Sequence, residues 1–105
     1  MDGNIEVVHV KDYGKKNKII DNETIYIYCG RPSKYGNPYS MRQESQREEV
    51  VNRFRSNETC KEVVKRLKVK LLSNPQFKNI KLGCFCSPRK CHCDVIKEWL
   101  EDDDV

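Results

Sequence analysis

The sequence contains no long apolar run, no internal repeat and no low-complexity stretch. None of its apolar segments approaches the roughly 20 residues that cross a bilayer as a helix. The first residues, Met1 to Asn4, also lack the pattern of a signal peptide. We therefore expect a cytoplasmic protein that has no membrane partner.

Extremes of composition are also absent. The chain has 105 residues, of which 37% are hydrophobic and 34% charged, and its net charge is +4. These values are typical of a soluble globular protein, and the length predicts a single domain over residues 1–105. The small positive charge favours anionic partners. Carboxylates crowd residues 101–105 and oppose the dipole of a helix that ends there, so we expect this acidic tail to be frayed.

Histidine is scarce, with two residues, whereas cysteine is abundant, with six. In a reducing compartment, such cysteines favour free thiols or metal ligands over a disulfide framework. Four of the cysteines and one histidine fall within the segment LGCFCSPRKCHCDVI, residues 82–96. This segment is a candidate metal site, a candidate reactive thiol, or a sulfur-rich part of the core.

Three short segments have the pattern of β-strands. Residues 5–10 and 24–29 are rich in β-branched and aromatic residues, and residues 80–86 form a third apolar run. Alternation in the second strand places Ile25, Ile27 and Cys29 on one face. We expect Tyr26 and Tyr28, on the other face, to pack under helices. Residues 11–23 are predicted to form a polar loop or hairpin.

Helical periodicity follows the second strand and returns at the end of the chain. Ser45 to Glu48 have the spacing of a capping box, and Asn57 is expected to cap a second helix. That helix carries an apolar stripe at Cys60, Val63, Val64, Leu67 and Leu71. Ser87 and Pro88 are expected to begin the last helix, whose apolar face contains Val95, Ile96, Trp99 and Leu100.

The order of these elements predicts an α/β fold, with a small, mostly parallel sheet of about three or four strands and helices packed on it. About fifty residues and two helices connect the strands 24–29 and 80–86, which favours a parallel pairing. The carboxyl ends of both strands would then lie at one edge of the sheet. The loop GRPSKYGNPY and the segment CSPRKCHC would face one crevice, where such sheets bind ligands.

The loop after residue 29 combines glycine, proline and cations. Its charged and hydroxyl side chains suit phosphate or carboxylate, and Tyr35 or Tyr39 can cover a flat group. The predicted ligand-binding residues are Gly30, Arg31, Pro32, Ser33, Lys34, Tyr35, Gly36 and Asn37, together with Arg89 from the later segment. The alternative is a long surface turn that its tyrosines anchor.

The later segment offers two kinds of chemistry. The candidate catalytic residues are Cys84, Cys86, Cys91 and His92. A thiolate there would be stabilised by a helix N-terminus and nearby cations, with His92 as a base. The same four residues are the candidate zinc ligands, although their spacing is cramped and no cofactor is predicted. Helical spacing turns Cys93 and Asp94 away from the apolar stripe.

Two further observations constrain this segment. A phosphatase loop of the C-x5-R type is excluded, because Lys90 and His92 occupy the positions that would need arginine. The start of the last helix can also bind an anion through its backbone N–H groups alone, with the sulfur atoms as core filler.

Together the two segments resemble domain of unknown function 4326, a family of small bacterial and phage proteins. The matching residues are Gly30, Arg31, Pro32, Ser33, Gly36, Asn37 and Pro38, and then Leu82, Gly83, Cys84, Cys86, Pro88, Cys91, His92 and Asp94. Cys93 departs from the pattern, which usually has a small residue there. The late segment is more loosely similar to domain of unknown function 488. The resemblance covers roughly residues 25–100 and implies an α/β fold without an established activity.

These observations favour a module that binds a small anionic, nucleotide-like ligand, and they leave open whether a cysteine also catalyses a reaction. The alternative is a zinc-stabilised interaction module that contacts nucleic acid through its basic loops. A scaffold without a ligand is the third interpretation. The sequence does not specify the ligand or the oligomeric state.

Overall fold

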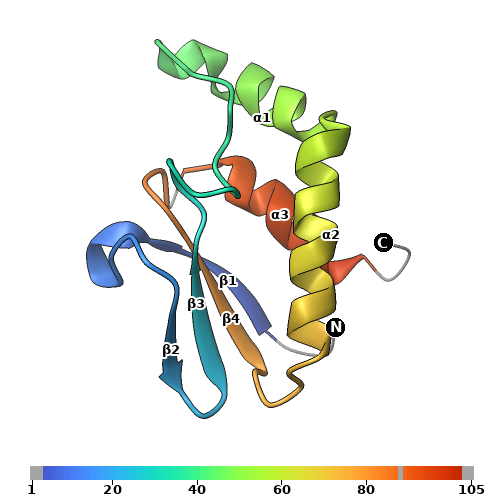
Figure 1. Cartoon of the computed structure of the whole chain (residues 1–105). Coiled ribbons are helices and arrows are strands. Elements are labelled where there is room, and N and C mark those ends of the chain that lie inside the picture. Colours follow the sequence, from blue (N-terminus) through green and yellow to red (C-terminus); the bar gives the residue numbers. More distant parts are fainter. Residues whose placement is uncertain (1–3, 88, 103–105) are drawn as a thin grey trace.

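The computed structural model describes residues 4–87 and 89–102 and contains a four-stranded mixed sheet at its centre. The strands are β1 (Asn4–His9), β2 (Lys18–Asp21), β3 (Thr24–Tyr28) and β4 (Asn79–Cys84), in the order β1-β4-β3-β2. β4 pairs in parallel with both β1 and β3, whereas β2 is antiparallel to β3 (Figure 1). The predicted α/β fold with a mostly parallel sheet is confirmed.

Three α-helices cover one face of this sheet: α1 (Arg47–Arg55), α2 (Glu58–Leu72) and α3 (His92–Glu101) (Figure 1). Ile27 and Leu82, which are partners in the β3–β4 register, join side chains from all three helices in the main core. The ring of Phe54 stacks on Trp99 with centroids 5.3 Å apart. The apolar stripes predicted for the helices therefore face the sheet.

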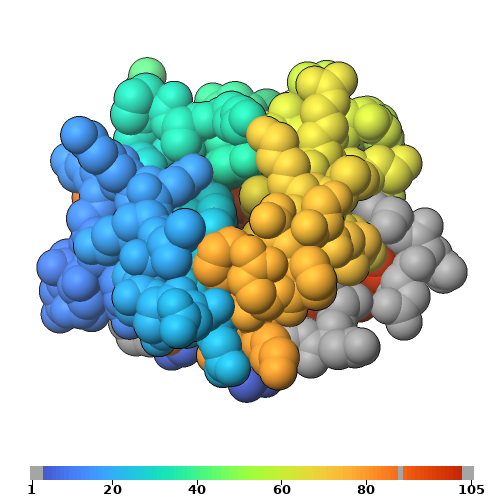
Figure 2. All heavy atoms as spheres, turned by 60° about the horizontal axis from the view of Figure 1, so that its bottom comes forward, coloured from blue at the N-terminus to red at the C-terminus, as the bar shows by residue number. Residues whose placement is uncertain are grey.

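The other face of the sheet carries a smaller cluster that contains Val8, Val10, Tyr26 and Tyr28. Tyr13 covers it by stacking on Tyr26, with centroids 5.0 Å apart. The expectation that the two β3 tyrosines pack under helices is wrong, because the β1–β2 connection, which includes the 3-10 segment Val10–Asp12, packs there instead. Figure 2 shows this blue part of the chain and the yellow α2 on opposite sides of the molecule.

One glycine of each sequence motif makes room for these tyrosines. A Cβ atom on Gly83 would lie 1.9 Å from Tyr26 Oη, and one on Gly30 would lie 2.4 Å from Tyr28 Oη. Each hydroxyl also bonds to a carbonyl: Tyr26 donates to Gly14 at 2.7 Å, and Tyr28 donates to Arg31. A side chain at either glycine would displace a buried ring, so both positions are fixed by packing.

Of the three predicted helix starts, one is confirmed and two differ from the structure. Asn57 caps α2 as expected, since its Oδ1 accepts the Cys60 N–H at 3.0 Å. The capping box at Ser45 is wrong, because a short 3-10 turn, Glu44–Gln46, precedes α1 and the Gln46 side chain accepts from backbone N–H groups before it.

The last helix begins four residues later than the position of Pro88, which lies outside the described residues. Cys91 is its N-cap, and the Asp94 carboxylate reaches back to accept the Cys91 N–H at 2.8 Å. This contact fixes the start of α3 at His92.

The acidic end of the chain is partly described. Glu101 belongs to α3, and the Lys68 ammonium donates a hydrogen bond to the Asp102 carbonyl oxygen. The rest of the tail predicted to be frayed, residues 103–105, lies outside the described residues. Within residues 4–87 and 89–102, no helix has the length and apolar character required to cross a bilayer.

Candidate functional site

The two motif segments meet at the carboxyl edge of the sheet, as the parallel strand pair requires. The Cys29 N–H, just after β3, donates to the Gly83 carbonyl of β4 at 2.9 Å. His92 Nε2, at the start of α3, lies 2.6 Å from the Cys29 carbonyl oxygen. Arg31 and His92 consequently border one pocket, which confirms the expected crevice.

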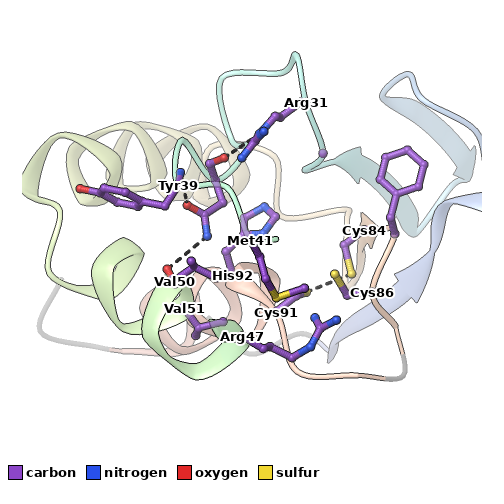
Figure 3. A pocket seen from close by; sticks show the side chains of 13 residues that line it. Arg31, Tyr39, Met41, Arg47, Val50, Val51, Cys84, Cys86, Cys91 and His92 are labelled. Carbon is purple, nitrogen blue, oxygen red and sulfur yellow. Dashed lines mark hydrogen bonds between the residues drawn. The ribbon is translucent and has the colours of Figure 1, made fainter. Parts of the chain in front are cut away.

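This pocket has a volume of about 350 Å³. Its walls come from the loop after β3, from α1, and from the β4–α3 segment (Figure 3). The described lining residues are Gly30, Arg31, Asn37, Tyr39, Met41, Arg47, Val50, Val51, Cys84, Phe85, Cys86, Cys91 and His92. Two of these are arginines and none is acidic, so the lining favours a negatively charged occupant.

Hydrogen bonds within the loop hold its backbone and attach it to α1. Arg31 donates from Nε to the Asn37 carbonyl at 2.9 Å and from Nη1 to Ser40 Oγ at 3.2 Å. The Asn37 amide donates to the Val50 carbonyl at 3.3 Å. Ser33 Oγ donates to the Gly30 carbonyl at 2.6 Å. Arg31 and Asn37 therefore shape the pocket, whereas the Ser33 hydroxyl stabilises the turn.

The structure brings only part of the predicted ligand-binding set to this pocket. Gly30, Arg31 and Asn37 line it, but Pro32, Ser33 and Gly36 do not. Two further residues border a different hollow beside α2, where the Lys34 ammonium lies 5.6 Å from the centre of the buried Tyr35 ring. The burial of Tyr35 therefore supports the alternative interpretation, in which this tyrosine anchors the loop.

Arg89 is exposed and also lies outside the pocket lining. Its guanidinium forms an ion pair with Glu44, at 2.9 Å.

Arg47 is the main lining residue that the sequence motifs did not reveal. From the first turn of α1, it donates through Nε and Nη2 to both oxygens of Glu44, at 2.8 and 2.7 Å, and through Nη1 to the Lys90 carbonyl at 2.9 Å. It also contacts the Cys86 thiol, and these partners, Glu44 first, raise the pKa of its guanidinium. Figure 3 shows its side chain extending toward the sulfur atoms.

Three thiols gather on the floor of the site. The sulfur atoms of Cys84, Cys91 and Cys93 all lie within 4.8 Å of one another, and each side chain is buried. The expectation that Cys93 turns away from the core is wrong. Cys93 precedes Ile96 by three residues and Leu100 by seven, so it shares their side of α3 and faces the sheet.

The metal-ligand set that the structure brings together therefore differs from the predicted one. It contains Cys93, whereas Cys86 and His92 do not belong to it. This buried group of three cysteines has the donor atoms to hold a metal ion.

The thiols differ in their affinity for protons. Cys91 Sγ donates to Cys84 Sγ across 3.0 Å, and the Cys93 sulfur lies within 4.8 Å of the same atom. These two contacts lower the pKa of Cys84 below its usual range. The contact with Cys84 raises the pKa of Cys91. Cys84 is consequently the thiol of this pair that ionises first.

His92 and Cys86, the other two predicted catalytic residues, also border the pocket. Burial lowers the pKa of His92, so its imidazole is neutral near pH 7, and its ring meets Phe54 edge to face at 5.2 Å. Its Nε2 lies 3.9 Å from Cys93 Sγ. Cys86 is half-buried rather than buried. It is the most accessible of the pocket thiols.

The fold and the site define a small α/β protein with a pocket at the carboxyl edge of its sheet and a thiol cluster on the pocket floor. Residues 11–102 match the model of the family described as Domain of unknown function (DUF4326). The chain belongs to this family, which confirms the resemblance of its two motifs. Comparisons with curated proteins and with solved structures gave no match.

Proposed function

We propose that the protein binds a small anionic, nucleotide-like molecule in the pocket at the carboxyl edge of the sheet. The observation that carries this proposal is the lining itself: arginines from two distant segments border a pocket of about 350 Å³ whose described lining contains no carboxylate. That volume lies within the range of roughly 300–1,000 Å³ typical of small-molecule sites.

The two walls of the pocket suit the two parts of such a ligand. Arg47 has five N–H donors, of which three bond to Glu44 and Lys90 and another faces the Cys86 thiol, so one remains for an anionic group. Met41, Val50 and Val51 supply an apolar surface, and Tyr39 adds a ring. A phosphate near the arginines and a base against the apolar wall would satisfy both surfaces.

A cysteine-dependent reaction is an extension of this proposal, and Cys86 is its candidate nucleophile. Its half-buried thiol borders the pocket and lies against the Arg47 guanidinium, where a bound ligand can reach it. Alkylation of Cys86 should abolish turnover of a bound ligand while preserving its affinity. Turnover that survives complete alkylation, or that is equal in Cys86→Ser, would exclude this role.

Binding is tested by isothermal titration calorimetry with AMP, GMP and inorganic phosphate. We expect Arg47→Gln to weaken nucleotide binding by about 10- to 100-fold, the usual effect of losing a hydrogen bond to a charged group. Arg66→Gln removes the same charge from an exposed position on α2 and serves as the matched control. Both variants are first compared by circular dichroism and urea unfolding to verify that they fold.

No heat of binding with any nucleotide, or equal loss in both variants, would refute the proposal. DNA and RNA oligonucleotides complete the panel. Salt-dependent binding to these polymers, without binding of mononucleotides, would favour a nucleic-acid-binding function instead.

A second candidate function is a zinc-stabilised interaction module. The buried group of three cysteines favours it. All six cysteines are free thiols, which is consistent with the reducing, cytoplasmic location that we propose for the protein. Metal analysis of protein purified without chelator tests this candidate, and a fully folded, metal-free protein would exclude it.

A further inference from the structure

We propose that Cys84, Cys91 and Cys93 form a three-thiolate site for Zn²⁺ or a similar thiophilic cation, with the fourth coordination position open to the pocket. This inference deepens the second candidate function and rests on it, but it does not depend on whether the pocket binds an anion. It also replaces the ligand set expected from the sequence, because Cys93 takes the place of Cys86 and His92.

The separation of the sulfur atoms fits a single ion. Tetrahedral zinc binds thiolates at about 2.3 Å, which places two sulfur ligands about 3.8 Å apart. All three sulfur atoms lie within 4.8 Å of one another, and Cys84 Sγ is 3.0 Å from Cys91 Sγ. Insertion of the ion therefore requires that this pair open by less than about 1 Å, a change that side-chain rotation can supply.

Backbone N–H groups lie near the sulfur atoms. Those of Cys86 and Ser87, two and three residues after Cys84, help to lower the pKa of its thiol. The Cys93 N–H acts on the pKa of the Cys91 thiol in the same direction. Donors of this kind stabilise thiolates and orient metal ligands.

The surroundings also suit the charge of such a site. One Zn²⁺ and three thiolates carry a net charge of −1, and binding releases the thiol protons to solvent. Cys91 caps α3, so the partial positive charge of the helix N-terminus lies against the cluster. Arg47 contacts the neighbouring Cys86 thiol and adds a full positive charge nearby.

The open position follows from which thiols reach the pocket. Cys84 and Cys91 line it, whereas Cys93 lies behind them among buried side chains. The nearest imidazole nitrogen, His92 Nε2, is occupied by the Cys29 carbonyl at 2.6 Å. Water or a neutral donor atom of a pocket ligand would complete the tetrahedron, as in zinc sites that keep an exchangeable position.

Metal analysis and cobalt substitution test the site on the full chain, purified under reductant without chelator. We expect one equivalent of bound zinc and, after exchange with Co²⁺, a thiolate-to-cobalt charge-transfer band. Cys93→Ser should lower zinc affinity by more than about 100-fold, since even the loss of an outer hydrogen bond costs 10- to 100-fold. Cys86→Ser is the matched control, because Cys86 lines the same pocket and should leave affinity nearly unchanged.

Cys93 is fully buried, so the serine variant needs a check of folding by circular dichroism. If it does not fold, the intensity of the cobalt band in the natural protein still counts the thiolate ligands. A folded protein that takes up neither ion would overturn the proposal, as would zinc loss in Cys86→Ser with retention in Cys93→Ser. Zinc binding without nucleotide binding would refute only the anion pocket, and the reverse result would refute only this site.

Discussion

Replacement of Gly83 by alanine should destabilise the protein because the space for a methyl group is taken by Tyr26. The new Cβ would lie 1.9 Å from Oη, 2.5 Å from Cζ and 2.6 Å from Cε1 of that ring. The ring is buried, stacks on Tyr13 and bonds to the Gly14 carbonyl, so it has no low-cost way to move. Overpacking costs about 1–3 kcal/mol, to which the strained hydrogen bond adds.

Alanine also gains about 0.5–1 kcal/mol over glycine in a strand, which offsets part of this cost. We therefore expect Gly83→Ala to lower the free energy of unfolding by about 2 kcal/mol. Urea unfolding followed through the fluorescence of Trp99, the single tryptophan, measures the change.

A double-mutant cycle identifies the ring as the cause. In a Tyr26→Val background the same Gly83→Ala change should cost close to zero. In Tyr26→Phe it should keep part of its cost, because the Cζ and Cε1 contacts remain whereas the Oη contact and its hydrogen bond are removed. An equal cost in all three backgrounds would refute the packing explanation.

Three other predictions concern the described elements. Burial raises the pKa of Tyr26 to about 12, so the difference in tyrosinate absorbance between the natural protein and Tyr26→Phe should show its ionisation near pH 12. Since the folded pKa is above the unfolded value, its contribution to stability should be complete below pH 10 and disappear as the pH approaches 12. Asn57→Ala should cost about 1 kcal/mol by removing the cap on the Cys60 N–H, whereas Asn57→Asp should retain most of the stability. Glu6→Gln should change the free energy of unfolding by less than about 0.5 kcal/mol, because the Glu6 carboxylate that pairs with Lys81 is exposed to solvent. Denaturant midpoints measure both substitutions, and a large Glu6 effect or no Asn57 effect would contradict them.

The sequence predicted those parts of the fold that depend on local patterns. Alternation along residues 24–29 separated the two faces of β3, and a single asparagine marked the start of α2. The start of α3 was missed because apolar periodicity defines the middle of a helix better than its end. Asp94, which reaches back to the Cys91 N–H, was the available signal.

The candidate site was predictable only where it follows from topology. Two parallel strands with motifs at their carboxyl ends sufficed to bring Arg31 and His92 to one pocket. Cys93 lies three residues before Ile96 and seven before Leu100, so it faces the sheet with them and joins the sulfur group, which the sequence analysis missed. Arg47 has no motif, because its place depends on how α1 packs against the β4–α3 segment.

The ion pairs around Glu44 have a consequence for how a ligand would enter. This carboxylate binds the guanidinium groups of both Arg47 and Arg89. If Arg47 rotates toward an incoming phosphate, Glu44 loses this ion pair but keeps the one with Arg89. The Glu44 carboxylate therefore still has a cationic partner. Arg89, although it lies outside the pocket, would thereby make Arg47 available to the ligand at little cost.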